Sequence, residues 1–208
     1  MIYELFPIPI YTHEPTTEEI FAIQHEISRA LPDIQKEIEA PKGREETLKS
    51  NVRTQLNTIT SHKLDNLAEY IKKHTKEYIK QTQSFMRQDT RIELSRSWIN
   101  LYDKEDGQGW HGHADAYISG TYYYKVTNDT TSGQLSFRNP SPFMRNGQFP
   151  VGDRYTINVD YPPVEGALVL FPSWFEHRVR NNNTDIQRIS ISFDWSKNVP
   201  NSIEQIFI

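Results

Sequence analysis

The stretch Arg188-Ile-Ser-Ile-Ser-Phe-Asp-Trp195 is the clearest indication of the fold, because polar and apolar side chains alternate along it without interruption. Such alternation predicts a β-strand with one apolar and one polar face. We expect the apolar face to be covered by helices from the N-terminal half of the chain. The strand is too aromatic and β-branched for an exposed edge, so the polar face is expected to line a pocket inside a jelly roll. That face carries Arg188, Ser190, Ser192 and Asp194.

The segments upstream of this strand have the same texture, rich in β-branched and aromatic residues and separated by turn residues. Short strands with this spacing are typical of an antiparallel sandwich or small barrel. The fold class is therefore predicted to be mainly β with added helices (α+β). We expect strands at residues 91–102, 116–126, 133–138, 154–159, 167–171, 176–181 and 186–195.

Two helices are predicted before the strands. The first, at residues 16–40, starts with the capping-box pair Thr16 and Glu19, and Pro32 is expected to kink or split it. The second covers residues 61–83, and its lysines are typical of a solvated face. We expect residues 1–208 to form a single domain, with a helical N-terminal part (1–88) and a jelly-roll catalytic core (89–208).

Composition excludes several classes of protein. The 208 residues can bury a sizeable core, and a net charge of -4 gives no reason to expect nucleic acid or an anionic membrane as a partner. The chain has no cysteine, which excludes disulfides, thiolate zinc sites and iron–sulfur clusters and is compatible with a reducing cytosol. Residues 1–11 do not have the pattern of a signal peptide, and no apolar run is long enough to span a bilayer. We therefore expect a cytoplasmic location.

His113, Asp115 and His177 are the candidate metal ligands. Two imidazoles and one carboxylate can hold one face of a ferrous ion and leave the other face open. His113 and Asp115 are two residues apart, so on an extended backbone their side chains project to the same side. Arg188 follows His177 with ten residues between them, and its guanidinium could hold the far carboxylate of a dicarboxylic co-substrate.

An alternative pairing starts at His111. His111-Gly112-His113 also has the pattern of the paired histidines of a cupin, but a cupin then has a glutamate a few residues later, and residues 114–118 contain none. We therefore favour His113 with Asp115 and place His111 near the pocket mouth. The four N-terminal histidines have no partner pattern and are expected at the surface: His13, His25, His62 and His74.

These residues resemble the Fe(II)/2-oxoglutarate-dependent oxygenase superfamily, and the segment Ser119-Gly-Thr-Tyr-Tyr-Tyr124 adds to the resemblance. The whole chain is similar to a small uncharacterised oxygenase subfamily of bacteria and tailed phages. Four motifs carry that likeness: Leu5-Phe-Pro-Ile-Pro-Ile10, Trp110-His-Gly-His113, Phe137-Arg-Asn-Pro140 and Leu170-Phe-Pro-Ser-Trp174.

The resemblance implies a double-stranded β-helix with the helices packed on one sheet. It implies Fe(II) bound by His113, Asp115 and His177, and 2-oxoglutarate and O2 as co-substrates. Arg188 would bind the distal carboxylate, assisted by Ser190 and a tyrosine, with Tyr124 preferred and Tyr122 second. Tyr123 is expected in the core. Related halogenases have a small residue in place of the carboxylate, so Asp115 favours hydroxylation.

A second group of residues is predicted near the substrate. Asn100 and Tyr102 share one face of the strand before the metal motif, and Trp110 and Trp174 flank the ligand segments. Residues 139–153 are the candidate for a substrate lid, because long irregular loops in compact domains are often functional.

The resemblance thus predicts a non-haem Fe(II) dioxygenase that hydroxylates an amino-acid side chain, including the option of a prolyl residue, or a small molecule. Succinate and CO2 would be released. The competing hypothesis is a non-catalytic metal-binding jelly roll, a phage structural or sugar-binding module. The primary substrate and the oligomeric state are not specified by the sequence, and a homodimer is an open option.

Overall fold

The computed structural model describes residues 7–38, 47–52, 57–82, 92–141 and 157–197. Its helices are α1 (Thr17–Ile34), the 3-10 helix η1 (Gln35–Glu37), α2 (Thr58–Ser61) and α3 (Asp65–Thr82). Its first five strands are β1 (Tyr11–His13), β2 (Lys49–Ser50), β3 (Ile92–Tyr102), β4 (Gln108–His111) and β5 (Ile118–Lys125). The others are β6 (Leu135–Arg138), β7 (Asn158–Tyr161), β8 (Leu168–Pro172), β9 (His177–Val179) and β10 (Arg188–Lys197).

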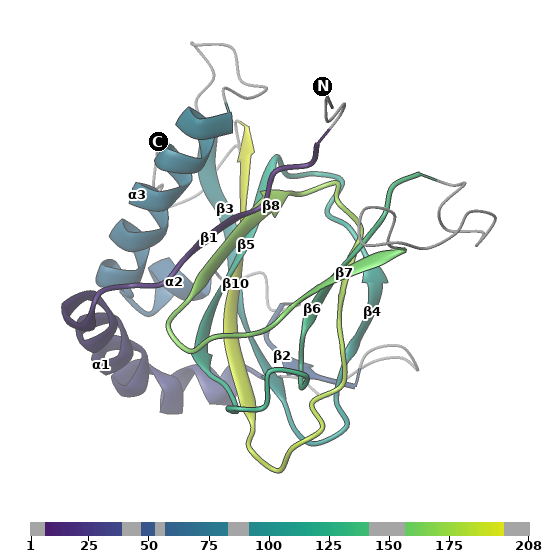
Figure 1. The fold of residues 1–208 in the computed structure, drawn as a ribbon. Coiled ribbons are helices and arrows are strands. Elements are labelled where there is room, and N and C mark those ends of the chain that lie inside the picture. The colour runs from purple at the N-terminus through teal and green to yellow at the C-terminus, as the bar shows by residue number, and fades with distance from the viewer. Residues whose placement is uncertain (1–6, 39–46, 53–56, 83–91, 142–156, 198–208) are drawn as a thin grey trace.

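The strands form two antiparallel sheets that face each other (Figure 1). The large sheet has the order β1-β8-β5-β10-β3-β2, and the small sheet has the order β4-β9-β6-β7. The chain crosses repeatedly from one sheet to the other, so that strands far apart in sequence become neighbours. This is the predicted double-stranded β-helix. The N-terminal part contributes the two edge strands β1 and β2. Strands β2 and β4 were not expected from the sequence.

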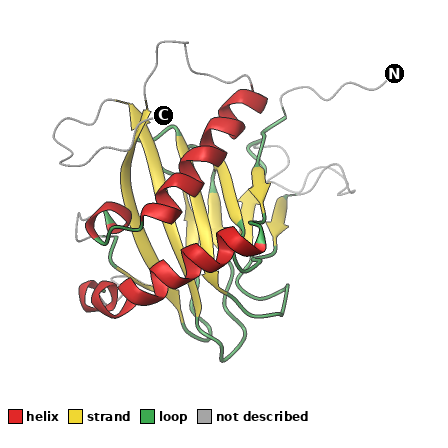
Figure 2. Cartoon of the chain, turned by 90° about the vertical axis from the view of Figure 1, so that its left-hand side faces the viewer, coloured by secondary structure: helices red, strands yellow, loops and turns green. Residues whose placement is uncertain are grey.

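The helices cover the outer face of the large sheet (Figure 2). Ile23, Ile27 and Ile34 of α1 and Leu67 and Ile71 of α3 are buried in one cluster with the apolar side chains of β10. The predicted capping box is present: Thr16 Oγ1 accepts from the Glu19 amide, and Glu19 reaches back to the Thr16 amide. Pro32 lies inside the last turn of α1, so it does not split the helix. None of the described helices is long and apolar enough to cross a membrane.

Strand β10 has the predicted faces. Ile189, Ile191, Phe193 and Trp195 are buried in the cluster under the helices. The strand lies between β3 and β5, and its other face points between the two sheets. Because β10 is central and both its faces are covered, its polar residues are enclosed as well.

One of the four N-terminal histidines departs from the prediction of surface positions. His74 is buried, with its Nδ1 atom 2.8 Å from the Tyr11 hydroxyl and its ring stacked on that of His13 at 3.9 Å. Burial and the positive potential of His13 lower the pKa of His74 to about 4. His74 continues the helical spacing of Leu67 and Ile71, and this was the sequence signal that could have placed it on the packed face.

Candidate metal centre

A pocket between the two sheets holds most of the predicted site. Its walls come from β3, β4, β5, β6, β8, β9 and β10. His111, His113 and His177 line it, and so do Arg188 and Ser190. Along β10, Arg188 and Asp194 are six residues apart, which corresponds to about 20 Å of extended strand. The arginine and the histidines therefore lie toward opposite ends of the pocket.

Among the described residues, three histidines form a cluster that could hold a metal ion. One ring nitrogen from each of His111, His113 and His177 lies within 4.8 Å of the other two. Strand β4 pairs with β9 so that His111 is opposite His177. Nitrogen atoms bound to one ion at about 2.1 Å lie about 3 Å apart when they are neighbours, so small ring rotations bring all three onto one metal. The set is compatible with one face of an octahedral ion.

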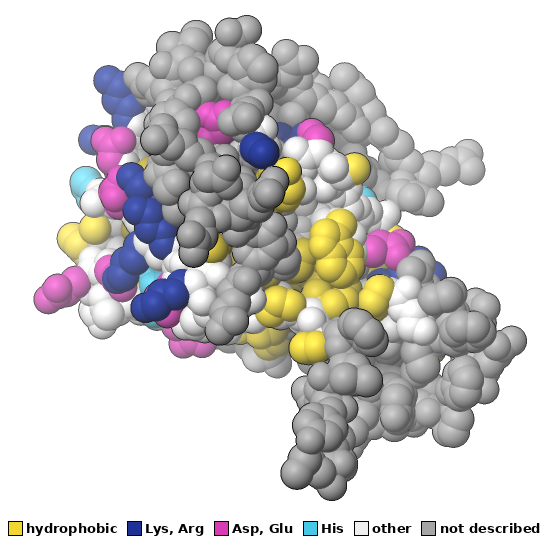
Figure 3. Space-filling model, turned by 90° about the horizontal axis from the view of Figure 1, so that it is seen from above, with side chains coloured by type: hydrophobic (Ala, Val, Ile, Leu, Met, Phe, Trp, Pro, Cys, Tyr) yellow, Lys and Arg dark blue, Asp and Glu magenta, His cyan; other side chains and the backbone are white. Residues whose placement is uncertain are grey.

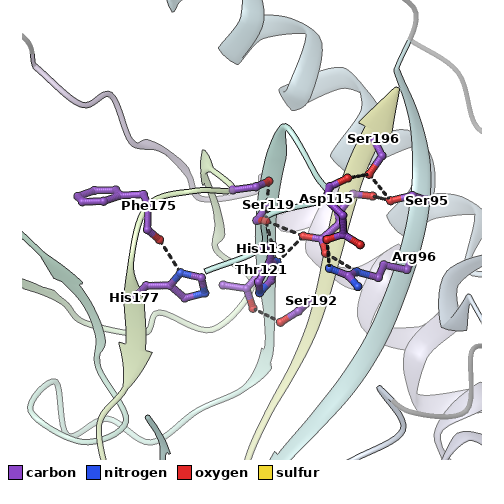
Figure 4. Close-up of polar contacts among 12 residues, drawn as sticks. Ser95, Arg96, His113, Asp115, Ser119, Thr121, Phe175, His177, Ser192 and Ser196 are labelled. Atoms are coloured by element: carbon purple, nitrogen blue, oxygen red, sulfur yellow. Dashed lines mark hydrogen bonds and ion pairs between the residues drawn. The ribbon is translucent and has the colours of Figure 1, made fainter. Parts of the chain in front are cut away.

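The second nitrogen of each ring fixes its tautomer. The Nδ1 atoms of His111 and His177 each lie 2.8 Å from a backbone carbonyl oxygen, that of Gly109 and that of Phe175. The Nδ1 atom of His113 lies 2.7 Å from Oδ1 of Asp194 (Figure 4). These acceptors carry no proton, so each Nδ1 must donate. The lone pair is then on Nε2 in all three rings, as a metal ligand requires.

The charge state of His177 also suits a ligand. It is almost fully buried on β9, and burial together with neighbouring His111 lowers its pKa to about 3. His177 is therefore neutral at physiological pH, and a metal ion does not have to displace a proton from it.

Asp115, the third predicted ligand, lies outside this cluster. Its side chain is 74% exposed and its Oδ1 atom accepts from Nη2 of Arg96 at 3.0 Å. The chain makes a turn at residues 114–115, so the alternation expected between His113 and Asp115 is broken. The alternation holds one step earlier, between His111 and His113. The structure thus brings His111 and His113 together, as in the alternative pairing. The cluster that they form with His177 contains no glutamate, in contrast to a cupin.

Asp194 is the carboxylate beside the histidines. It is fully buried and receives hydrogen bonds from His113 Nδ1, the Ser119 hydroxyl and Arg96 Nε. Burial raises the pKa of this carboxyl, but the bonds from His113 and Ser119 and the attraction of His113 and Arg96 outweigh it, so the pKa lies below its ordinary value. The sequence placed Asp194 on the polar face of β10 but assigned it no role.

The arginine end of the pocket is built for an anion. Arg188 is 2% exposed, and its Nη1 atom donates to the Ser190 hydroxyl at 3.2 Å. Its guanidinium carbon lies 4.6 Å from the ring centre of Tyr102 and 5.0 Å from that of Tyr123. Its Nε atom is buried without a hydrogen-bond partner, and no carboxylate in the described residues forms an ion pair with it. A buried cation without a counter-ion is costly unless an anionic ligand completes it.

The tyrosine prediction is corrected by the parity of β5. Ser119, Thr121 and Tyr123 point between the sheets, whereas Tyr122 and Tyr124 pack into the cluster under the helices. Tyr123 is fully buried in the core between the sheets, as expected, and it is the tyrosine of this strand beside Arg188. Burial raises the pKa of the Tyr123 hydroxyl, which keeps it protonated. The polar residues Ser119 and Thr121 on the same face were the sequence signal that could have identified it.

The remaining predicted residues divide into two groups. Asn100 and Tyr102 line the pocket, and Asn100 Nδ2 donates to the Ser192 hydroxyl at 3.0 Å. Trp98 also lines it and packs against His113, a contact the sequence did not suggest. Trp110 is not in the pocket lining, because its ring lies under Arg178 and Arg138. Trp174 is 58% exposed. The predicted lid, residues 139–153, lies mostly outside the described residues.

A family model covers the segment of the chain that builds this site. Residues 96–194 match the model of a family described as "Putative 2OG-Fe(II) oxygenase". That segment contains all the pocket residues discussed above, and the resemblance predicted from the sequence is confirmed. The family's description includes both Fe(II) and 2-oxoglutarate, the cofactors expected from that resemblance. A search of curated proteins finds no relative of the chain.

Solved structures confirm the fold. A Pseudomonas putida prolyl-4-hydroxylase is 15% identical, with 92% of this chain and 94% of that chain covered at a TM-score of 0.59. The carbocyclase SnoK from nogalamycin biosynthesis is 11% identical, with 97% and 92% covered at a TM-score of 0.65. HygX from Streptomyces hygroscopicus, solved with nickel, 2-oxoglutarate and hygromycin B, is 11% identical, with 91% and 83% covered at a TM-score of 0.56. None of these comparisons bears on a phage origin.

Proposed function

We propose that the protein is a 2-oxoglutarate-dependent Fe(II) dioxygenase that hydroxylates a C–H bond and uses His111, His113 and His177 as its metal ligands. The observation that carries the proposal is the buried, uncompensated Arg188 in the same pocket as the three histidines. A metal-binding module without catalysis has no need of this arginine. The competing hypothesis of a structural or sugar-binding jelly roll leaves it unexplained.

Each protein group has a defined task in this proposal. The histidines hold the metal through Nε2, and three protein ligands leave three positions of a six-coordinate ion open. Arg188 and Ser190 bind the distal carboxylate of 2-oxoglutarate. The aromatic rings of Tyr102 and Tyr123 pack against the guanidinium of Arg188 and hold it in place. Fe(II) bound there would supply, with 2-oxoglutarate and O2, the oxidant that replaces a hydrogen by hydroxyl, with release of succinate and CO2. The low exposure of Arg188 excludes water from the carboxylate contact.

The reaction outcome follows from the number of ligands. Asp115 was the predicted reason for hydroxylation over halogenation, and this reason no longer applies. His111 takes its place in the proposed ligand set, so the number of protein ligands is still three. With three protein ligands, a metal held there would have the same number of protein ligands as in the predicted set. Hydroxylation or a related C–H oxidation is retained in the proposal.

For the substrate we propose an amino-acid side chain or a small molecule that reaches the metal past Trp174. The Ser173 carbonyl accepts from the His113 amide at 2.8 Å, so the segment that carries Trp174 is bonded to the backbone of a metal ligand. Trp174 and Tyr117 are 58% and 44% exposed, and Figure 3 shows hydrophobic side chains gathered on the face seen from above. An exposed indole beside the centre offers an apolar platform for a substrate. Prolyl-hydroxylase neighbours favour a peptide, whereas HygX with hygromycin B favours a small molecule.

Anaerobic addition of Fe(II) and 2-oxoglutarate to the metal-free protein tests the proposal. We expect a visible absorption band that requires both additions, followed in air by release of succinate. The Arg188→Met variant serves as the control, because it keeps the histidines and should lose the band at 2-oxoglutarate concentrations that saturate the parent. Neither band nor succinate from the folded parent would contradict the proposed function.

A further inference from the structure

Asp194 is a buried charge to which the proposed chemistry gives no task. Its side chain has no exposed surface, and both of its oxygen atoms accept hydrogen bonds. Oδ1 accepts from His113 and Ser119, and Oδ2 accepts from Arg96. Taking a carboxylate out of water costs several kcal/mol even when it is well bonded. Stability is therefore a weak reason for an aspartate at this position.

The three histidines differ in what their Nδ1 atoms meet. His111 and His177 donate to neutral backbone carbonyls. His113 alone donates to a carboxylate, at 2.7 Å. An anionic acceptor behind a ligating imidazole increases the electron density on Nε2 and makes it a stronger ligand. Only His113 has such an acceptor. The proposed ligand set of three histidines contains no carboxylate itself.

We infer that Asp194 is the carboxylate of the metal centre, acting on the metal through the ring of His113 as a positioning and charge-supplying residue. Three histidine ligands contribute no negative charge to offset the double positive charge of a divalent ion. A carboxylate one imidazole away offsets part of that charge and holds the ring in the ligating tautomer. The inference rests on the proposed function, because it requires that His111, His113 and His177 bind a divalent metal.

Arg96 gives the inference a distinctive signature. Its Nε atom donates to Asp194 and its Nη2 atom to Asp115, so it bridges a buried and an exposed carboxylate (Figure 4). The guanidinium draws negative charge away from Asp194 and thereby opposes its effect on His113. If Asp194 acts by charge, removal of Asp194 and removal of Arg96 should change metal affinity in opposite directions. If the two residues only hold the strands together, removal of either should have the same effect.

Titration of the metal-free protein with Co(II), followed by the visible absorption of the bound ion, tests this signature. We expect Asp194→Asn to lower Co(II) affinity by about 10- to 100-fold, the usual cost of losing a partner behind a ligand. Arg96→Gln should leave the affinity unchanged or raise it. Asp115→Asn is the matched control, because Asp115 is also a carboxylate bonded to Arg96 but does not contact His113. The Co(II) affinity of this variant should stay within about threefold of the parent.

The outcomes separate this inference from the proposed function. Parent affinity in folded Asp194→Asn, with Co(II) binding lost in His177→Ala, would overturn the inference and leave the proposed function standing. A tenfold or greater loss in Arg96→Gln would also overturn it, and this arm applies even if Asp194→Asn does not fold. A parent protein that binds no Co(II) would overturn both. Circular dichroism of each variant establishes that the fold is retained.

Discussion

The two ends of the pocket bind opposite charges, and their hydrogen bonding differs accordingly. At the metal end, the Nδ1 atoms of His111, His113 and His177 each lie within hydrogen-bond distance of an oxygen acceptor. At the other end, Arg188 has one bonded nitrogen and a buried Nε atom that lacks an acceptor. We infer from this difference that a metal ion at the histidines and an anion at Arg188 together complete the polar groups of the pocket. The difference also predicts that the two ends can be disabled separately.

The largest effect is expected at the metal end. His177→Ala removes one of three ligands, so Co(II) affinity should fall by more than about 100-fold, a larger loss than that of a partner behind a ligand. Isothermal titration of the metal-free protein measures it. His25→Ala, which removes an exposed histidine from α1, is the matched control and should bind like the parent. Retained affinity in His177→Ala would exclude His177 as a ligand.

Arg188→Met should disable only the carboxylate end. Loss of charge-assisted hydrogen bonds of about 1.5–3 kcal/mol corresponds to a fall of about 10- to 150-fold in 2-oxoglutarate affinity. Co(II) affinity without 2-oxoglutarate should change by less than about threefold. Titration of the Co(II)-loaded variant with 2-oxoglutarate gives the first value. If both affinities fell together, the two ends would not be independent.

A smaller effect is expected from Gly133, which packs against Arg188. A Cβ atom at Gly133 would lie 2.8 Å from Arg188 Cδ, and its φ of 61° is unfavourable for other residues. Gly133→Ala should therefore displace Arg188 and raise the KM for 2-oxoglutarate by about threefold to tenfold, with loss of about 1 kcal/mol of stability. Gly166→Ala is the control, because Gly166 has a similar φ of 81° but packs against Ile20. A KM change in Gly166→Ala of the same size would mean a general effect of strain.

The last prediction concerns the dependence of stability on pH, and it separates the pocket from the helices. The native pKa values of His74, about 4, and His177, about 3, are below the ordinary value of 6.5. The unfolded chain then binds protons that the native state does not, so stability falls as pH drops below about 6.5, by up to about 1.4 kcal/mol per pH unit for each histidine. Thermal unfolding of the metal-free protein from pH 7 to 4.5 measures the slope. His74→Phe should flatten the slope without altering Co(II) affinity; an unchanged slope would contradict the role of His74.

The sequence predicted most of the pocket wall but not the ligand set. The alternation along β10 was sufficient to place Arg188 and Ser190 inside, because a strand covered on both faces keeps strict parity. Asp115 was misplaced because that parity was extended across the turn at residues 114–115, and turns interrupt it. The tyrosine was misassigned because the family pattern was given more weight than the parity of Ser119 and Thr121. The contact of Asp194 with His113 joins residues 81 apart and depends on how the strands pair.

One pair of variants distinguishes whether His111 or Asp115 is the third metal ligand. Anaerobic Fe(II) and 2-oxoglutarate are added to metal-free His111→Ala and Asp115→Ala, and the visible absorption band is recorded for each. We predict that His111→Ala forms no band and that Asp115→Ala forms the band of the parent with at most a threefold change in Fe(II) affinity. A band in His111→Ala and none in Asp115→Ala would contradict the three-histidine centre and restore the carboxylate to the metal.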